Sequence, residues 1–173
     1  MLTITERLHD PQPAVDRLVL PFELRQKSRM RCRLGSGQEA GVVLDRGTLL
    51  RGGDLLRATD GRVIEVIAAP ETVTVVRTNN PWQLARAAYH LGNRHVPVQL
   101  GKGWLRYVHD HVLDDMLHGL GFELDVEVLP FEPEGGAYAH AGHSNAGHSD
   151  HEQDDDRGHG HDHDHAHRSH EHA

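Results

Sequence analysis

The fold of this chain is decided by residues 73–100, which read VTVVRTNNPWQLARAAYHLGNRHVPVQL. Residues 73–78 show the period-two alternation of a β-strand. Asn80 and Pro81 then open a helix, because an Asn side chain caps a helix N-terminus and proline is favoured at the first helical position. Apolar residues follow at helical spacing, at Leu84, Ala88 and Leu91. One stripe of this helix is therefore expected to face a sheet.

Further elements follow this helix. The pair Gly92-Asn93 is typical of a left-handed helix end. Two strands, a second helix capped by Asp110 and a last strand are predicted over 96–100, 104–108, 112–120 and 124–128. The order β-α-β-β-α-β is that of a ferredoxin-like domain, which we assign to residues 73–138.

Residues 1–72 predict a small all-β domain, so the expected fold class is α+β. Residues 28–34 alternate three apolar side chains with three arginines, which places the apolar ones on one face of a strand. Shorter strand candidates, separated by glycine-containing turns, lie at 41–44, 48–50 and 63–68. Short strands at this spacing are typical of a small sandwich or barrel.

Composition separates residues 139–173 as a third region. The chain has 173 residues and a net charge of −8, and 11 of its 17 histidines lie in this region. Residues 1–131 hold 16 acidic and 16 basic side chains, so the whole net charge comes from residues 132–173. Almost nothing there is apolar, and we predict a disordered His-rich tail.

Several classes of protein are excluded on the same grounds. No region is strongly basic, which argues against nucleic-acid binding, and no apolar stretch approaches the roughly 18 residues of a membrane span. The N-terminus lacks the pattern of a signal peptide, so we expect a cytoplasmic protein.

The sequence offers no convincing enzymatic motif. Residues 35–40 match the nucleotide-binding pattern G-x-G-x-x-A, but a strand pattern follows where a phosphate-binding helix should begin. The pair Asp114-Asp115 is attributed to the helix macrodipole, and we expect no enzyme.

The tail histidines predict metal binding. From His159 to His167 they alternate strictly with Gly, Asp and Ala, and neutral imidazole binds Ni²⁺, Cu²⁺ and Zn²⁺ alike. An expression tag is the alternative, but a tag is usually an uninterrupted histidine run. The candidate ligands are His140, His143, His148, His151, His159, His161, His163, His165, His167, His170 and His172.

Three histidines before the tail are candidates as well. His95 lies between the first helix and the next strand, where a histidine is more often a hydrogen-bonded structural residue. Near a two-fold axis, however, one histidine per chain becomes two ligands. His109 and His111 could chelate a metal together if the chain is extended there and would splay apart if it is helical. An equal alternative is that these two histidines are ordinary polar residues at the start of a helix and form no metal site.

Three segments, YHLGNRHVP at 89–97, HDHVLDDML at 109–117 and PFEPE at 130–134, carry a family resemblance, with LLRGGD at 49–54 as a looser match. Over residues 2–138 the chain resembles the UreE family of urease accessory proteins, which are cytoplasmic nickel metallochaperones. The resemblance implies a homodimer with a peptide-binding-like first domain and the ferredoxin-like domain at its interface. It also implies that His95 is the essential nickel ligand and that His109 and His111 form a peripheral metal pair.

The function expected from these features is nickel delivery to urease. The dimer would collect Ni²⁺ on its tails, hold one ion between two His95 residues, and pass it to a GTP-dependent urease accessory protein on the urease apoprotein. Cu²⁺ and Zn²⁺ are expected to bind in vitro too. One alternative is a divalent-metal storage or buffering protein. Another is a prolyl isomerase with a His-rich tail, although the chain has only three Phe, three Tyr and two Trp.

Overall fold

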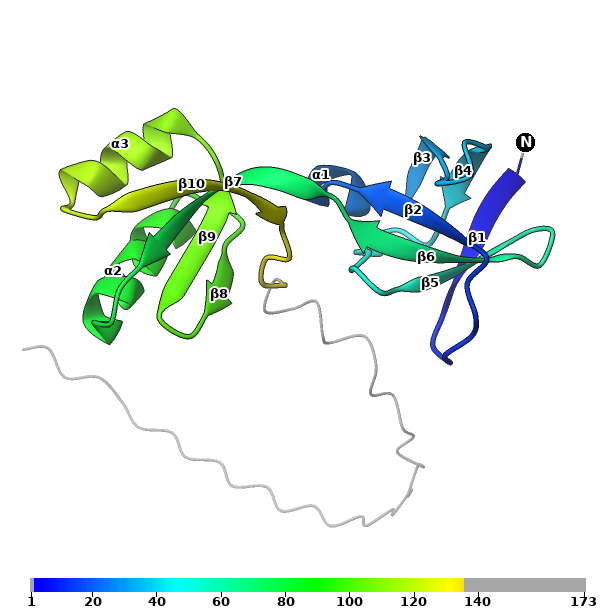
Figure 1. Cartoon of the computed structure of the whole chain (residues 1–173), viewed down its shortest axis with the longest axis horizontal. Coiled ribbons are helices and arrows are strands. Elements are labelled where there is room, and N and C mark those ends of the chain that lie inside the picture. Colours follow the sequence, from blue (N-terminus) through cyan, green and yellow to red (C-terminus); the bar gives the residue numbers. More distant parts are fainter. Residues whose placement is uncertain (1, 136–173) are drawn as a thin grey trace, which may run out of the picture. The chain divides into compact units, whose positions relative to one another are not determined.

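The computed structural model describes residues 2–135, which form two β-sheets and three helices (Figure 1). This part of the chain is mixed helix and strand, and mostly sheet. The predicted tail, residues 139–173, and its candidate histidines lie outside the described residues. Among the helices of residues 2–135, none is long and apolar enough to cross a membrane.

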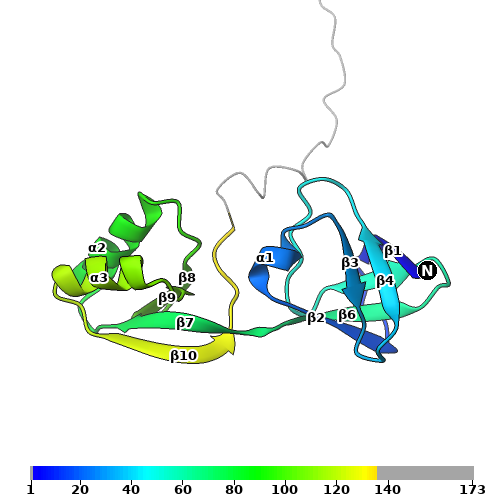
Figure 2. The same ribbon diagram turned by 90° about the horizontal axis from the view of Figure 1, so that it is seen from above.

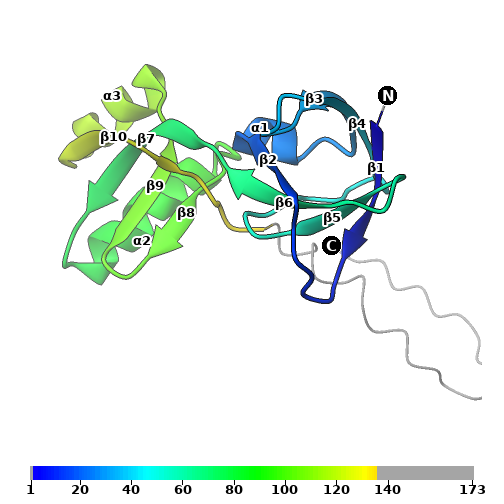
Figure 3. The ribbon, with the colours of Figure 1, turned by 45° about the vertical axis from the view of Figure 1, so that its right-hand side comes forward.

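The first sheet has six strands in the order β2-β6-β5-β1-β4-β3. Its elements are, in chain order, β1 (Leu2–Leu8), β2 (Asp16–Leu20), α1 (Phe22–Arg25), β3 (Arg29–Arg33), β4 (Glu39–Val43), β5 (Leu55–Ala58) and β6 (Val63–Ala68). β1 runs parallel to β4 and β2 parallel to β6, and the other pairs are antiparallel. The sheet curls, so that β3 and β4 lie opposite β5 and β6 (Figure 3).

The curled sheet closes over an aliphatic core to which every strand contributes. Its fully buried members include Ile4, Leu18, Leu50, Leu56, Ile64 and Val66. Met30 and Cys32 pack against this core, while the three arginines of β3 are exposed. The strand predicted within residues 28–34 is therefore confirmed together with the assignment of its two faces.

The strand predicted at residues 48–50 is wrong, because this segment is a loop. Thr48 closes a turn through its N–H and its hydroxyl, which both donate to the Asp45 carbonyl, at 3.2 and 2.8 Å. The Leu50 N–H donates to the Arg25 carbonyl at 2.9 Å, and its side chain is fully buried. The apolar residues of this segment belong to a loop that covers the core.

The prediction that residues 1–72 are all-β is also wrong, since the four-residue helix α1 follows β2.

The second sheet has four antiparallel strands in the order β10-β7-β9-β8. Its elements are, in chain order, β7 (Pro70–Arg77), α2 (Pro81–Gly92), β8 (Gln99–Gly101), β9 (Trp104–Val108), α3 (His111–Gly119) and β10 (Leu124–Pro130). Both helices cover one face of this sheet (Figure 2). They bury Leu91 and Leu117 in the cluster that holds Tyr107 of β9. Each helix and strand predicted after residue 72 has a counterpart here, although β8 begins at Gln99 rather than at residue 96.

Both longer helices begin where their capping residues predict. The Asn80 side chain accepts a hydrogen bond from the Trp82 N–H at 3.0 Å, and Pro81 is the first helical residue. The Asp110 side chain accepts one from the Val112 N–H at 2.8 Å. Because such caps satisfy N–H groups that have no partner within the helix, the local sequence is enough to set these two starts.

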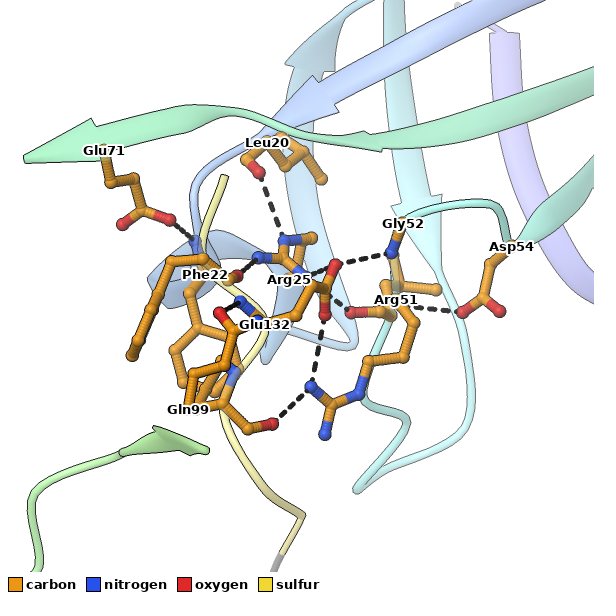
Figure 4. A network of polar contacts seen from close by, with 12 residues as sticks. Leu20, Phe22, Arg25, Arg51, Gly52, Asp54, Glu71, Gln99 and Glu132 are labelled. Atoms are coloured by element: carbon orange, nitrogen blue, oxygen red, sulfur yellow. Dashed lines mark hydrogen bonds and ion pairs between the residues drawn. The ribbon is translucent and has the colours of Figure 1, made fainter. Parts of the chain in front are cut away.

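The segment after β10 is bound through Glu132 to α1 and to the loop between β4 and β5 (Figure 4). Glu132 Oε1 accepts from Arg25 Nη1 and from the Gly52 N–H, both at 2.7 Å. Glu132 Oε2 accepts from Arg51 Nη1 at 3.2 Å, and the same nitrogen donates to the Pro133 carbonyl at 2.6 Å. A β-carbon on residue 52 would stand 3.0 Å from Glu132 Oε1, so glycine permits this close approach.

Arg25 is fully buried and lies at the centre of this network. Its guanidinium also donates to the carbonyls of Leu20 at 3.2 Å, Leu50 at 3.4 Å and Phe131. A buried charge needs a counterion as well as hydrogen bonds, and Glu132 supplies it. Burial alone would raise the pKa of Glu132, but a backbone N–H and two guanidinium groups outweigh burial and lower this pKa below its ordinary value.

Candidate metal-binding histidines

His95 lies in the turn that ends α2. The His95 N–H donates to the Gly92 carbonyl at 2.9 Å, and the Val96 N–H donates to the Leu91 carbonyl at 3.2 Å. This pair of bonds is the Schellman motif, which places one residue after the helix in the left-handed conformation. That residue is His95, with a φ of 57°. Val96 packs against the core that contains Leu91, which holds the turn in place.

The left-handed position of His95 is one that normally holds glycine. Every other residue with positive φ within the described range 2–135 is a glycine. A left-handed backbone costs a non-glycine residue roughly 1–2 kcal/mol, yet the His95 side chain is exposed and not held by core packing. Strain of this kind clusters at functional sites.

The helix α2 ends at Gly92 as predicted, but the left-handed conformation predicted at Gly92-Asn93 is wrong. Asn93 has a φ of −63° and is still right-handed. The chain keeps helix-like hydrogen bonds one residue further, with the Arg94 N–H donating to the Leu91 carbonyl at 3.0 Å. The turn therefore comes two residues later than the sequence predicts, and it falls on the candidate metal ligand.

His109 follows β9, and one side of its ring is anchored. His109 Nδ1 lies 3.0 Å from Thr74 Oγ1 and 3.0 Å from Asp114 Oδ2. Thr74 is fully buried on β7, and Asp114 on α3 is 8% exposed. The His109 side chain itself is 38% exposed. Its second ring nitrogen, Nε2, has no partner among residues 2–135 and remains available as a ligand.

Asp114 is a residue of the site that the sequence interpretation missed. Its Oδ1 accepts hydrogen bonds from Thr74 Oγ1 at 2.9 Å and from the Tyr107 hydroxyl at 2.6 Å. Burial and, after it, the hydrogen bond to Asp114 raise the pKa of Tyr107 far above its ordinary value, so the phenol stays a donor. The macrodipole interpretation of Asp114 was incomplete. Its position three residues before the buried Leu117, on the stripe facing the sheet, was the available signal.

His111 is the first residue of α3 and is exposed. Asp110, between the two candidate histidines, has an extended backbone with φ −149° and ψ 119°. The pair therefore straddles the change from strand to helix and is neither wholly extended nor wholly helical. His90 on α2 makes an edge-on contact with the Tyr89 ring, with centroids 5.4 Å apart.

The described part of one chain forms no closed metal site. Among residues 2–135, no three His, Cys, Asp or Glu side chains gather in a group that could hold a metal ion. Cys32 is half-buried, with Sγ 3.4 Å from the Ala40 carbonyl, and burial raises the pKa of its thiol. Its packing against the core is that of a small apolar residue.

An exposed apolar face lies on α2, the helix that ends at His95. Trp82 and Tyr89 are 75% and 64% exposed, and with Ala85 and Arg86 they line a shallow pocket. These four residues follow one another at i, i+3, i+4 and i+7, so they share one side of the helix. Exposed aromatic side chains grouped in this way are typical of protein interfaces. The helical spacing of these four residues in the sequence already places them opposite the buried stripe of α2.

Two family models together match nearly the whole chain. The model described as UreE urease accessory protein, N-terminal domain, matches residues 3–69, and the C-terminal domain model matches residues 71–172. A urease accessory protein UreE of Alkalilimnicola ehrlichii is 60% identical over 138 residues, which cover 80% of this chain and 85% of the relative. Those of Enterobacter sp. strain 638 and Pseudomonas putida strain W619 are 56% and 53% identical, over 83% and 87% of this chain and 95% and 94% of the relatives. These matches confirm the resemblance seen in the sequence, and the chain belongs to the UreE family of urease accessory proteins.

Proposed function

We propose that this protein is a nickel-binding metallochaperone that collects Ni²⁺ and delivers it for assembly of the urease active site. Membership of a family of urease accessory proteins supports the biological role. The observation that carries the metal assignment is the exposed His95, held in a left-handed backbone that favours glycine. The protein acts in the cytoplasm by ligand exchange and is not an enzyme.

In this proposal, two copies of the chain share the central nickel ion. One exposed imidazole gives a metal ion one ligand, and a two-fold axis near His95 supplies a second. The α2 face that contains Trp82, Ala85 and Tyr89 is the proposed contact surface, because it is apolar, exposed and part of the helix that presents His95. Tail histidines, carboxylates or water complete the coordination sphere.

The proposal gives each region of the chain a separate role. Residues 1–72 form a peptide-binding-like domain. Residues 73–138 form a ferredoxin-like domain, which the strand order β10-β7-β9-β8 supports. The tail histidines collect Ni²⁺, and His109 with His111 forms a peripheral site. A GTP-dependent urease accessory protein, bound to the urease apoprotein, receives the ion.

Nickel retention is expected to fall sharply between about pH 7.5 and about pH 5. Ligation needs neutral imidazole, whose ordinary pKa is about 6.5, so protons compete with Ni²⁺ as the pH falls. Equilibrium dialysis of the full chain against the same free Ni²⁺ at both pH values measures the loss. Equal retention at the two pH values argues against imidazole ligation.

Urease activation separates delivery from storage. In urease-producing cells that lack their own UreE protein and grow on limiting Ni²⁺, the His95→Ala chain is expected to give no more urease activity than no chain at all. His118→Ala is the matched control, because His118 is an exposed histidine in the last turn of α3. The control is expected to activate urease like the unchanged chain. If His95→Ala activates equally well, the storage alternative is favoured, because that variant keeps its whole tail.

A further inference from the structure

Three side chains from separate elements meet next to His109. Thr74 comes from β7, Tyr107 from β9 and Asp114 from α3, and Thr74 is paired with Tyr107 in the register of the two strands. Antiparallel partners point to the same face of a sheet, which here is the face that the helices cover. The backbone of His109 is fixed as well, because its N–H donates to the Thr72 carbonyl at 3.0 Å.

The hydrogens available in this cluster determine which ring nitrogen of His109 is protonated. His109 Nδ1 lies 3.0 Å from Thr74 Oγ1, with which it forms a hydrogen bond, and 3.0 Å from Asp114 Oδ2, with which it forms an ion-pair contact. Tyr107 and Thr74 have one hydroxyl hydrogen each, and both are within hydrogen-bonding distance of Asp114 Oδ1, at 2.6 and 2.9 Å. With its own hydrogen used in this way, Thr74 Oγ1 can only accept from His109, so the ring hydrogen belongs to His109 Nδ1. The Asp114 carboxylate 3.0 Å from Nδ1 favours the same position of the hydrogen.

The opposite tautomer does not fit these distances. With the hydrogen on Nε2, the lone pair of Nδ1 would face the Asp114 carboxylate, and two acceptors would be 3.0 Å apart. The Thr74 hydroxyl could then donate either to His109 or to Asp114, although it lies 3.0 Å from the first and 2.9 Å from the second. Either His109 Nδ1 would lose its hydrogen bond, or the buried Asp114 carboxylate would keep only the one from Tyr107, and losing a hydrogen bond is costly.

We infer that Asp114 is a positioning residue for metal binding at His109: it holds the imidazole as the Nδ1–H tautomer and leaves the Nε2 lone pair free for a divalent cation. This inference rests on the proposed function, since it takes His109 as a ligand of the peripheral site. A carboxylate that accepts a hydrogen bond from the other ring nitrogen of a histidine ligand fixes the ring orientation and makes the ligand a better donor to the metal. Thr74 and Tyr107 in turn fix the carboxylate.

A purely structural role for Asp114 is the competing explanation. In that case Asp114 would serve only to satisfy two hydroxyl groups under α3, and the contact with His109 would be incidental. The two explanations differ in what they predict for the His109 tautomer, and the tautomer can be observed without metal. Proton–nitrogen correlation spectra of the imidazole distinguish Nδ1–H from Nε2–H directly.

The test uses the full chain, labelled with ¹⁵N, stripped of metal and kept near pH 8.5, where an ordinary imidazole is neutral. Comparison with His109→Gln assigns the resonances of His109. The unchanged protein is expected to show predominantly Nδ1–H at His109. Thr74→Val is expected to keep this tautomer, because Asp114 Oδ2 remains at 3.0 Å.

Asp114→Asn is expected to reverse the tautomer. The amide oxygen is needed by the Tyr107 hydroxyl, so the amide NH₂ faces His109 and donates to Nδ1, which moves the ring hydrogen to Nε2. Asp114→Ala removes the acceptor altogether and is a second variant in which the Nδ1–H fraction should fall. The inference is overturned by a predominantly Nε2–H ring in the unchanged protein, or by a Nδ1–H fraction that neither variant lowers.

Nickel titration at buffered free Ni²⁺ then measures the effect on binding. The free Ni²⁺ concentration at which the His109 resonances are half broadened is expected to rise about 10-fold to 100-fold in Asp114→Asn, the usual effect of losing a partner of a metal-bound histidine. It is expected to stay the same in Asp115→Asn, which changes the exposed neighbouring carboxylate of α3. If His109 shows Nδ1–H in the unchanged protein but does not respond to saturating Ni²⁺, the ligand role of His109 in the proposed function fails. If His109 responds to Ni²⁺ equally in Asp114→Asn and in the unchanged protein, the positioning role of Asp114 fails instead.

Discussion

Replacing His95 with glycine or alanine is expected to remove the nickel ion that remains bound after the tail is deleted. With the chain shortened after Tyr138, most bound ions should be lost, and the residual site is the one shared by two copies of His95. The two His95 variants should differ in stability, however. Glycine relieves the left-handed strain at φ 57°, so the glycine variant is expected to be about 1 kcal/mol more stable than the alanine variant.

This pair of variants separates loss of a ligand from loss of the fold. Nickel content after dialysis measures binding, urea unfolding measures stability, and sedimentation shows whether the dimer persists. His118→Ala in the shortened chain is the control and should keep the residual ion. In the full chain, His95→Ala should barely change the total number of ions, because the tail is intact. Retention of the residual ion by both His95 variants of the shortened chain would overturn the shared site.

The features that the sequence predicted well are those set by nearby residues. Asn80 and Asp110 cap the helices that follow them, and each cap acts within three residues of itself. The strands β1, β2 and β5 were not predicted, because their pairing depends on distant segments. β1 pairs in parallel with β4 and antiparallel with β5. No short-range pattern in residues 2–8 identifies those partners.

In the candidate site too, the sequence predicts features set by nearby residues and misses those set by distant contacts. The sequence places His95 at a junction, but Gly92 and Asn93 are the residues that local preference favours for a left-handed turn. Packing of Val96 against the core containing Leu91 moves the turn onto His95 instead. Such a shift depends on tertiary contacts, which sequence spacing does not contain.

Two segments that carried the family resemblance, residues 49–54 and residues 130–134, meet in the structure. Glu132 in the second segment bonds to Arg51 and Gly52 in the first, and to the buried Arg25 (Figure 4). Neither segment forms a strand over most of its length. Their characteristic sequences are therefore explained by an ionic network and a close backbone approach.

Glu132→Ala is expected to lower the free energy of unfolding by about 3 kcal/mol at pH 7, the lower end of the range for breaking a buried ion pair. It removes the counterion of Arg25, whose side chain is fully buried, whereas that of Glu132 is 28% exposed. The carbonyl acceptors of Arg25 remain, which keeps the loss from being larger. Glu134→Ala is the matched control: Glu134 is exposed, and its backbone N–H, which the substitution keeps, donates to the Val98 carbonyl at 2.9 Å. The control should stay within about 0.5 kcal/mol, as urea unfolding can measure.

The difference between the unchanged protein and Glu132→Ala should shrink in acid. The folded-state pKa of Glu132 lies below its ordinary value. Its stabilising contribution is therefore fully present above the unfolded-state pKa of about 4.3 and is lost as the pH falls through the lowered folded-state pKa. Urea unfolding at about pH 7 and again at about pH 3 should show the unchanged protein approaching the alanine variant. A difference as large at the acid pH would mean that the Glu132 charge does not stabilise the buried guanidinium of Arg25, and that alanine weakens the fold through lost packing instead.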